Sequence, residues 1–156
     1  IDAEIFPKLI HMLAYADLKV KREACWALSN ATSMHSEQPN QVKYLVQQGC
    51  IKPLCDLLHC PDIKIILVAL GGLNNILEVG ETEALATETG LNPYAYKVEE
   101  CGGMDIIAEL QNHKNSKIYE ESKSIIDRFF AGEDDLIQDF EQEELDYQIP
   151  SGGFNF

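Results

Sequence analysis

Three residues in one short stretch, Glu23, Trp26 and Asn30, have the side-chain types that recognise a peptide. An indole offers a face for a cationic or aliphatic group, an amide can hydrogen-bond a peptide backbone, and a carboxylate attracts a basic group. In a helix over residues 21–32, at about 100° per residue, Trp26 and Asn30 lie together and Glu23 lies toward the same side. They lie away from an arc of small and apolar residues that we expect to be the core face: Val20, Ala24, Ala27, Leu28 and Ala31. Two interpretations follow, a tryptophan covered by another segment or an exposed binding surface.

The densest group of possible metal ligands is Cys50, Cys55, His59 and Cys60. Zinc sites favour close cysteine pairs such as C-x2-C, whereas a helix here would point Cys50 and Cys55 about 140° apart. We therefore expect Cys25 and Cys55 to pack in the core, with no metal site and no cofactor. The five cysteines have no disulfide spacing, which favours reduced thiols in a protein of the cytosol or nucleus.

No arrangement of residues suggests catalysis. The four histidines are scattered, and no Ser/His/Asp or Cys/His set stands out. Gly71 and Gly72 lack the preceding strand and the following Lys-Ser/Thr of a phosphate-binding loop, so we expect them to allow two helices to approach closely. The sequence therefore predicts a protein that is not an enzyme.

The charge is strongly negative and unevenly spread. The chain carries a net charge of −14 from 26 acidic and 12 basic residues. Residues 132–156 hold eight of the acids and none of the bases, which leaves residues 1–131 with 18 acids against 12 bases, a net charge of −6. Direct contact with nucleic acid needs Lys and Arg, so the charge disfavours it and favours basic partners. The sequence has no run of about 20 apolar residues and no signal pattern, so we expect no membrane contact.

An internal repeat organises the chain. Residues 6–13 match residues 51–58 at an offset of 45, and a third copy begins at Met104 after a further offset of 53. The extra length falls in residues 81–91, which we expect to be a loop insertion. A period in the low to mid forties is typical of armadillo and HEAT repeats, whose neighbouring units share one core.

Each full unit is expected to contain three helices. The breaks predict these helices: about 39–48 ending at Gly49, 51–59 ending before Pro61, 63–79 ending at Gly80, 93–100, 104–111 after Gly102-Gly103, and 116–130. The first copy lacks its short helix, so we expect the chain to begin inside a repeat. The sequence thus predicts an all-α domain of armadillo repeats over 1–131, with about two and a half repeats, and a mostly disordered acidic tail over 132–156.

The repeat also bears on Trp26, which corresponds to Gly71 and then to Ser124. A core tryptophan would be replaced by other apolar residues in the sister copies, so this replacement favours an exposed, ligand-facing ring. At the position of Asn30, the second copy keeps an asparagine and the third has Arg128.

Three segments, residues 23–33, 44–58 and 99–104, resemble the last repeats of the importin-α (karyopherin-α) family of nuclear-import adaptors. The resemblance covers about residues 1–131. It implies a right-handed superhelical armadillo solenoid containing part of the eighth repeat, the ninth and the tenth. The acidic tail would follow, and the importin-β-binding arm and the repeats of the major signal site would be absent.

The resemblance implies that basic nuclear localisation signals lie along a groove formed by the third helices. Asparagine amides would bind the signal's backbone, tryptophan rings its Lys and Arg stems, and acids the charged heads. Glu23, Trp26 and Asn30 match the last such set of the minor site, and Asn75 continues it. Because Gly71 stands where the next tryptophan would be, we expect the groove to end there.

The family further implies shuttling between nucleus and cytoplasm, contact with importin-β through a segment absent here, and binding of an importin-β-class export receptor and of nucleoporins at the final repeats. We expect the contacts with the export receptor and nucleoporins at Tyr119, Glu120, Lys123, Asp127, Glu133, Asp134 and Asp135. Two alternatives are an adhesion or signalling scaffold of the β-catenin type, which would bind acidic partners and is disfavoured by the charge, and a metal protein or enzyme using the Cys and His residues.

Overall fold

The computed structural model describes residues 4–33 and 39–131, and within these ranges the chain is all-helical, with no strand. This confirms the predicted all-α class, while the predicted tail over 132–156 lies outside the described residues. The helices are α1 (Ile5–Tyr15), α2 (Leu18–Ser33), α3 (Pro39–Gln47), α4 (Ile51–Leu57), α5 (Ile63–Leu85), α6 (Pro93–Glu100), α7 (Gly103–Leu110) and α8 (Ser116–Phe129).

The repeat is visible in the way the third helices α2, α5 and α8 begin. Asp17 accepts a hydrogen bond from the backbone N–H of Val20 at 3.0 Å. Asp62 and Asn115, at the equivalent positions, each accept two hydrogen bonds from the N–H groups two and three residues later. Such caps satisfy backbone donors that a helix leaves unpaired at its start. A capping Asp or Asn therefore fixes the start of the long helix in every copy.

Two of the predicted corners are confirmed. Gly49 between α3 and α4 and Gly102 between α6 and α7 have φ angles of 86° and 74°. These left-handed conformations suit glycine, because other residues pay a steric cost there.

The prediction that the third helix of the second copy ends at Gly80 is wrong. Helix α5 continues to Leu85, so the start of the expected 81–91 insertion is helical. Gly80 is buried, and a Cβ there would lie 2.0 Å from Asn92 Oδ1. The Asn92 amide donates to the Leu77 carbonyl at 2.9 Å. Gly80 is therefore a point of close approach between α5 and the start of α6.

Gly71 and Gly72 lie where two helices meet, as expected, but the contact does not require glycine. Helix α5 does lie against α2 at this point, where Ser29 is the nearest residue. A Cβ on Gly71 or Gly72 would lie 3.8 Å or 3.6 Å from the nearest Ser29 atom, which is ordinary van der Waals contact. The helices are therefore not so close that glycine is required.

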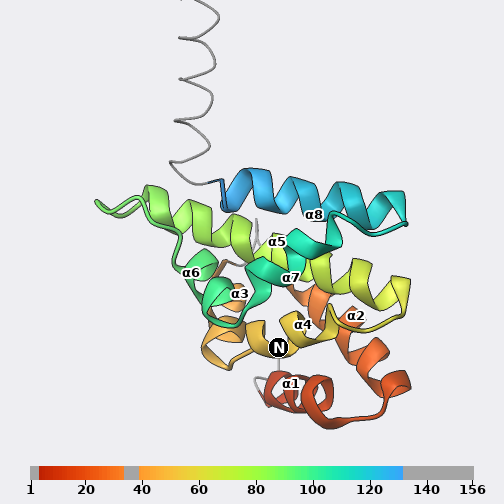
Figure 1. The fold of residues 1–156 in the computed structure, drawn as a ribbon. Coiled ribbons are helices and arrows are strands. Elements are labelled where there is room, and N and C mark those ends of the chain that lie inside the picture. Colours follow the sequence, from red (N-terminus) through yellow and green to blue (C-terminus); the bar gives the residue numbers. More distant parts are fainter. Residues whose placement is uncertain (1–3, 34–38, 132–156) are drawn as a thin grey trace, which may run out of the picture.

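Helix α5 is the centre of the structure. It packs against α2, α8, α4, α6 and α3, and α8 lies along it on the side opposite α2 (Figure 1). By length and composition alone α5 could cross a membrane, but 56% of its most apolar window is buried inside the protein. The described residues share one hydrophobic core, in which the neighbours of α5 cover its apolar sides.

The buried face of α2 is rotated from the predicted one. Ala24, Leu28 and Cys25 are buried as expected, but Thr32 is buried with them, and Val20, expected on the core face, is 38% exposed. Cys25 and Thr32, which lay outside the predicted arc, shift the centre of the buried face away from Val20. The same rotation places Glu23, Trp26 and Asn30 on the opposite, exposed side.

Candidate functional site

Trp26 is exposed in the part of the chain that the structure describes, which favours the exposed-ring interpretation. Its exposed fraction is 60%, in a helix held in place by the fully buried neighbours Cys25 and Leu28. Trp26 and Glu23 line one side of an open hollow of about 500 Å³ between α2 and α5. The α5 side contributes an apolar floor of Ile65, Leu67 and Val68. Sequence reasoning missed this floor, because it comes from a helix about 40 residues away.

Both basic and acidic side chains line the hollow at Trp26, whereas the sequence suggested an acidic site. Arg22 and Lys64 also line it. Arg22 forms an ion pair with Asp62, whose carboxylate also caps α5. The N–H of Ile65 and the Arg22 guanidinium lower the pKa of Asp62, which keeps the pair charged. Within the part of the chain that the structure describes, Glu23 forms no ion pair.

The two asparagines differ in how they are used. Asn30 is exposed on α2, one helical turn after Trp26. Asn75 is half-buried, and its amide donates to Thr32 Oγ1 on α2 at 3.1 Å. An amide has two N–H donors and one acceptor, so this bond leaves Asn75 able to make others. The structure therefore brings Glu23 and Trp26 together and places Asn30 beside them. The Asn75 amide uses one of its N–H groups in a hydrogen bond between α5 and α2.

At the equivalent place in the third copy, Arg128 forms two ion pairs with α5. Its Nη1 donates to Glu78 Oε1 at 3.0 Å, and its Nη2 donates to Glu81 Oε2 at 2.6 Å. The hydrogen bond to Glu81, followed by the charges of Glu81 and Glu78, raises the pKa of Arg128. The guanidinium carbon also lies 4.9 Å from the centre of the Phe129 ring. The repeat alignment located Arg128, but its acidic partners lie 47 and 50 residues earlier and were not predicted.

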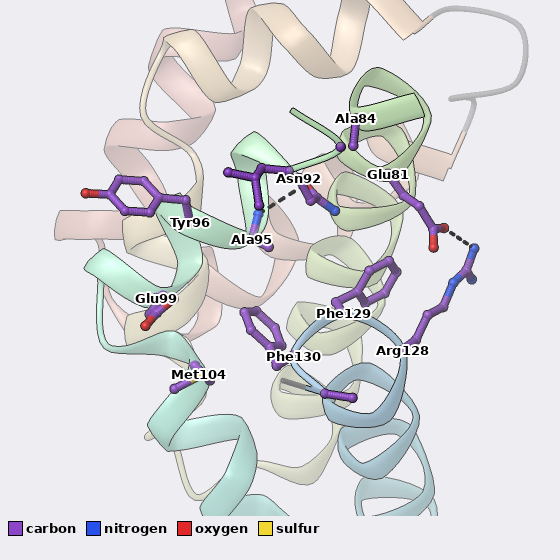
Figure 2. Close-up of a pocket in the computed structure, with 13 residues that line it drawn as sticks. Glu81, Ala84, Asn92, Ala95, Tyr96, Glu99, Met104, Arg128, Phe129 and Phe130 are labelled. Carbon is purple, nitrogen blue, oxygen red and sulfur yellow. Dashed lines mark hydrogen bonds and ion pairs between the residues drawn. The ribbon is translucent and has the colours of Figure 1, made fainter. Parts of the chain in front are cut away.

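A second hollow, of about 620 Å³, adjoins this ion pair. Figure 2 shows Glu81 and Arg128 at one edge, Tyr96 and Glu99 at the opposite edge, and Phe129 and Phe130 between them. Helices α5, α6, α7 and α8 all contribute to its lining. This second hollow was not predicted, because it depends on how the last helices meet.

The residues expected to contact a receptor form one stripe on α8. Tyr119, Glu120, Lys123 and Asp127 are all exposed, and their spacing places them on the side away from the buried Ile118, Ser122 and Ile125. Lys123 and Asp127 pair with each other at 2.6 Å. The remaining three expected contacts, Glu133, Asp134 and Asp135, lie outside the described residues.

The cysteines are core residues. Cys25, Cys50 and Cys55 are buried, and burial raises the pKa of each thiol to about 12. All five cysteines are free. Among residues 4–33 and 39–131, no group of three or more His, Cys, Asp or Glu side chains could hold a metal ion. The predicted core packing of Cys25 and Cys55 is confirmed.

Comparison with known proteins agrees with the repeat. An armadillo/beta-catenin-like repeat model matches residues 1–33 and 38–78, and an atypical Arm repeat model matches residues 92–146. Importin subunit alpha-5 of Arabidopsis thaliana is 44% identical over 131 residues, which cover 84% of this chain and 24% of the relative. Importin subunit alpha-4 of the same plant is 44% identical over 167 residues, covering 100% and 31%. Importin subunit alpha of Saccharomyces cerevisiae is 45% identical over 103 residues, covering 66% and 19%. The chain thus spans less than a third of the length of these relatives.

Proposed function

Because this chain belongs to the importin-α family of armadillo-repeat proteins, we propose that it binds basic nuclear localisation signals on its third-helix face. We define the third-helix face as the surface of α2, α5 and α8 that carries Trp26, Asn30, Asn75 and Arg128. On this proposal the chain belongs to an import adaptor, without enzymatic activity, that moves between cytoplasm and nucleus. The observation that carries the proposal is the exposed Trp26 ring beside Glu23, above an apolar floor.

The geometry suits the aliphatic stem and charged head of a basic side chain. The stem of a Lys or Arg would lie against the Trp26 ring and the floor formed by Ile65 and Val68, while its head would reach Glu23. The Asn30 amide, one turn further along α2, would bind the peptide backbone. Because Lys64 also lines the hollow and repels a cationic head, we expect weak binding. Added salt should weaken it further, since salt screens the attraction between the basic peptide and the acidic protein.

The test is a titration with a lysine- and arginine-rich peptide. Trp26 is the only tryptophan, alongside six tyrosines, so fluorescence excited selectively at tryptophan reports on this site alone. We expect the peptide to change the emission and to protect the ring from iodide quenching. By calorimetry, Trp26→Ala should weaken binding by about tenfold or more, as removal of a central aromatic anchor does. The matched control is Tyr96→Ala, which removes a similarly exposed aromatic ring from α6 and should leave the affinity unchanged. Equal affinity of the wild type and Trp26→Ala would refute the proposal.

Arg22 and Lys64 give one observation in favour of the alternative, a scaffold that binds acidic partners. An acidic peptide of equal length therefore belongs in the same titration. The net negative charge and the pairing of Arg22 with Asp62 favour the basic peptide. Tighter binding of the acidic peptide would refute the proposed binding of basic signals and favour a scaffold for acidic partners.

We also propose that the exposed stripe of α8 contacts an export receptor of the importin-β class or a nucleoporin, together with Glu133, Asp134 and Asp135. The shared exposure of Tyr119, Glu120, Lys123 and Asp127 supports a contact at this stripe. With purified receptor, Tyr119→Ala and Glu120→Lys should each reduce binding. Glu100→Lys, an equivalent charge change at an exposed position of α6, serves as the control. Unchanged binding by both α8 variants would exclude the stripe as a contact surface.

A further inference from the structure

The guanidinium of Arg128 is held on three sides by its own chain. Carboxylates of Glu78 and Glu81 each accept one of its N–H groups, at 3.0 Å and 2.6 Å, and the Phe129 ring lies 4.9 Å from its central carbon. The two carboxylates are one helical turn apart on α5, so a single guanidinium can bridge them through separate nitrogens. The Asn74 amide also donates to Glu78 Oε1, at 3.2 Å, which orients that carboxylate. Two carboxylates and an aromatic face together form an arginine site.

This arginine site lies on the third-helix face. Arg128 stands where the other two copies have Asn30 and Asn75, and Glu78 follows Asn75 by less than one turn of α5. A peptide that passed Trp26 and Asn75 and continued toward α8 would therefore meet Glu78 and Glu81 next. Side-chain exposed fractions of 25% for Glu78 and 42% for Glu81 show that solvent reaches both carboxylates.

We propose that Arg128 is a built-in competitor for basic peptides: it fills from within the chain the site at Glu78 and Glu81 that an arginine of a bound peptide would otherwise occupy. The third-helix face therefore ends because its last arginine site is already taken. The inference that Arg128 limits how far a bound peptide extends rests on the proposed function. The arginine site itself is supported independently by the contacts of Arg128.

The chemistry of the site favours arginine over lysine. A planar guanidinium can donate to both carboxylates and lie against a ring at the same time, whereas an ammonium group is a compact point charge. Replacing Arg128 by alanine removes the guanidinium that bridges the carboxylates of Glu78 and Glu81, while the Asn74 amide still donates to Glu78. Because like charges one turn apart repel, the altered protein gains stability when a cation binds between them.

The test uses N-acetyl-arginine amide, with N-acetyl-lysine amide as the weaker ligand, at constant ionic strength. We expect the arginine derivative to raise the melting temperature of Arg128→Ala, by about 5 °C at ten times its dissociation constant, because a ligand of the folded state stabilises it. The wild type should respond less, because any binding at Trp26 is common to both proteins. The control Lys123→Ala loses a single-carboxylate pair from the same helix and should respond no more than the wild type.

Adding Glu81→Gln to Arg128→Ala should reduce the response to that of the wild type, because only one carboxylate then remains. If Arg128→Ala does not fold, Arg128→Gln, with a side chain that still reaches across the surface, replaces it in the same assay. Equal responses of the Arg128 variant and Lys123→Ala would overturn the proposal, as would an unchanged response after Glu81→Gln. Since a single amino-acid derivative does not need Trp26, either result leaves the peptide site at Trp26 to its own titration.

Discussion

The two ends of the third-helix face carry similar side chains, but those at one end are exposed and those at the other end surround Arg128. At the α2 end, the Trp26 ring and the Glu23 carboxylate are exposed beside an apolar floor. At the α8 end, the Phe129 ring and two carboxylates surround the guanidinium of Arg128. Both ends combine an aromatic face with acids, which is the combination that binds a basic side chain. Only the α2 end presents that combination to a partner.

This difference shows how a repeat protein can limit a binding surface without changing its fold. Helices α2, α5 and α8 begin with equivalent caps and occupy equivalent places in their repeats. The change lies in single positions on this common framework, with Trp26 replaced by Gly71 and Asn30 replaced at the third copy by Arg128. On the present proposals, the replacement of Trp26 removes a stacking ring and that of Asn30 fills an acidic site.

The largest expected effect is a loss of stability on substitution of Gly80, the residue of α5 that directly precedes Glu81. A Cβ at Gly80 would collide with Asn92 Oδ1, so Gly80→Ala should displace the cap of α6 and cost about 1–3 kcal/mol of unfolding free energy, as overpacking does. Gly71→Ala is the matched control. Its Cβ fits beside Ser29, so alanine should stabilise α5 by up to about 1 kcal/mol. Urea denaturation of both variants checks the pair, and a change of the same sign in both would contradict the account.

The next largest effect is a difference in the free energy of unfolding between a variant at each of the two ends. Arg128→Ala removes two exposed ion pairs between α8 and α5, which should cost about 1 kcal/mol at low salt and less at 1 M salt. Trp26→Ala should change stability by no more than about 0.5 kcal/mol, because the ring is exposed. Urea melts at both salt concentrations measure the costs. If Trp26→Ala destabilised the protein more than Arg128→Ala did, the Trp26 ring would have a structural role. The α2 end would then not be an open binding surface.

The smallest effect concerns pH and the helix caps. The N–H of Ile65 and the Arg22 guanidinium lower the pKa of Asp62, so its contribution to stability is present above the ordinary aspartate range and is lost as pH falls through the lowered pKa. Asp62→Asn should therefore flatten the fall of the melting temperature between pH 5 and pH 2. At the equivalent cap of α8, Asn115 does not titrate, and Asn115→Asp should steepen that fall. Parallel melting curves for wild type and Asp62→Asn would show that this cap does not control the acid response.

Local signals predicted most of the fold. Glycines at positive φ, such as Gly49, and the capping residues of the third helices act within one turn of the chain, so the sequence reveals them directly. The prediction at Gly80 was wrong because nothing local distinguishes a glycine that ends a helix from one that allows a close neighbour. Gly80 is needed because Asn92, the capping residue of α6, lies directly against it.

The candidate site was predictable only where the repeat itself carried the information. The replacement of Trp26 by Gly71 and Ser124 pointed to an exposed ring, and the ring is exposed. The floor beneath it and the acids around Arg128 come from α5, and their contacts depend on how neighbouring repeats pack. A pattern of residue types along one helix does not contain that relation between helices.

The most direct measurement of the central claim is an NMR titration of the isotope-labelled protein with a lysine- and arginine-rich peptide. We expect shifts of the Trp26 indole N–H and of the Asn30 and Asn75 side-chain amides, with no shift of the Arg128 guanidinium signals. In Arg128→Ala, the perturbed surface should extend to backbone amides around Glu78 and Glu81. Shifts at Arg128 in the wild type, or none at Trp26, would contradict a face that is open at α2 and closed at α8.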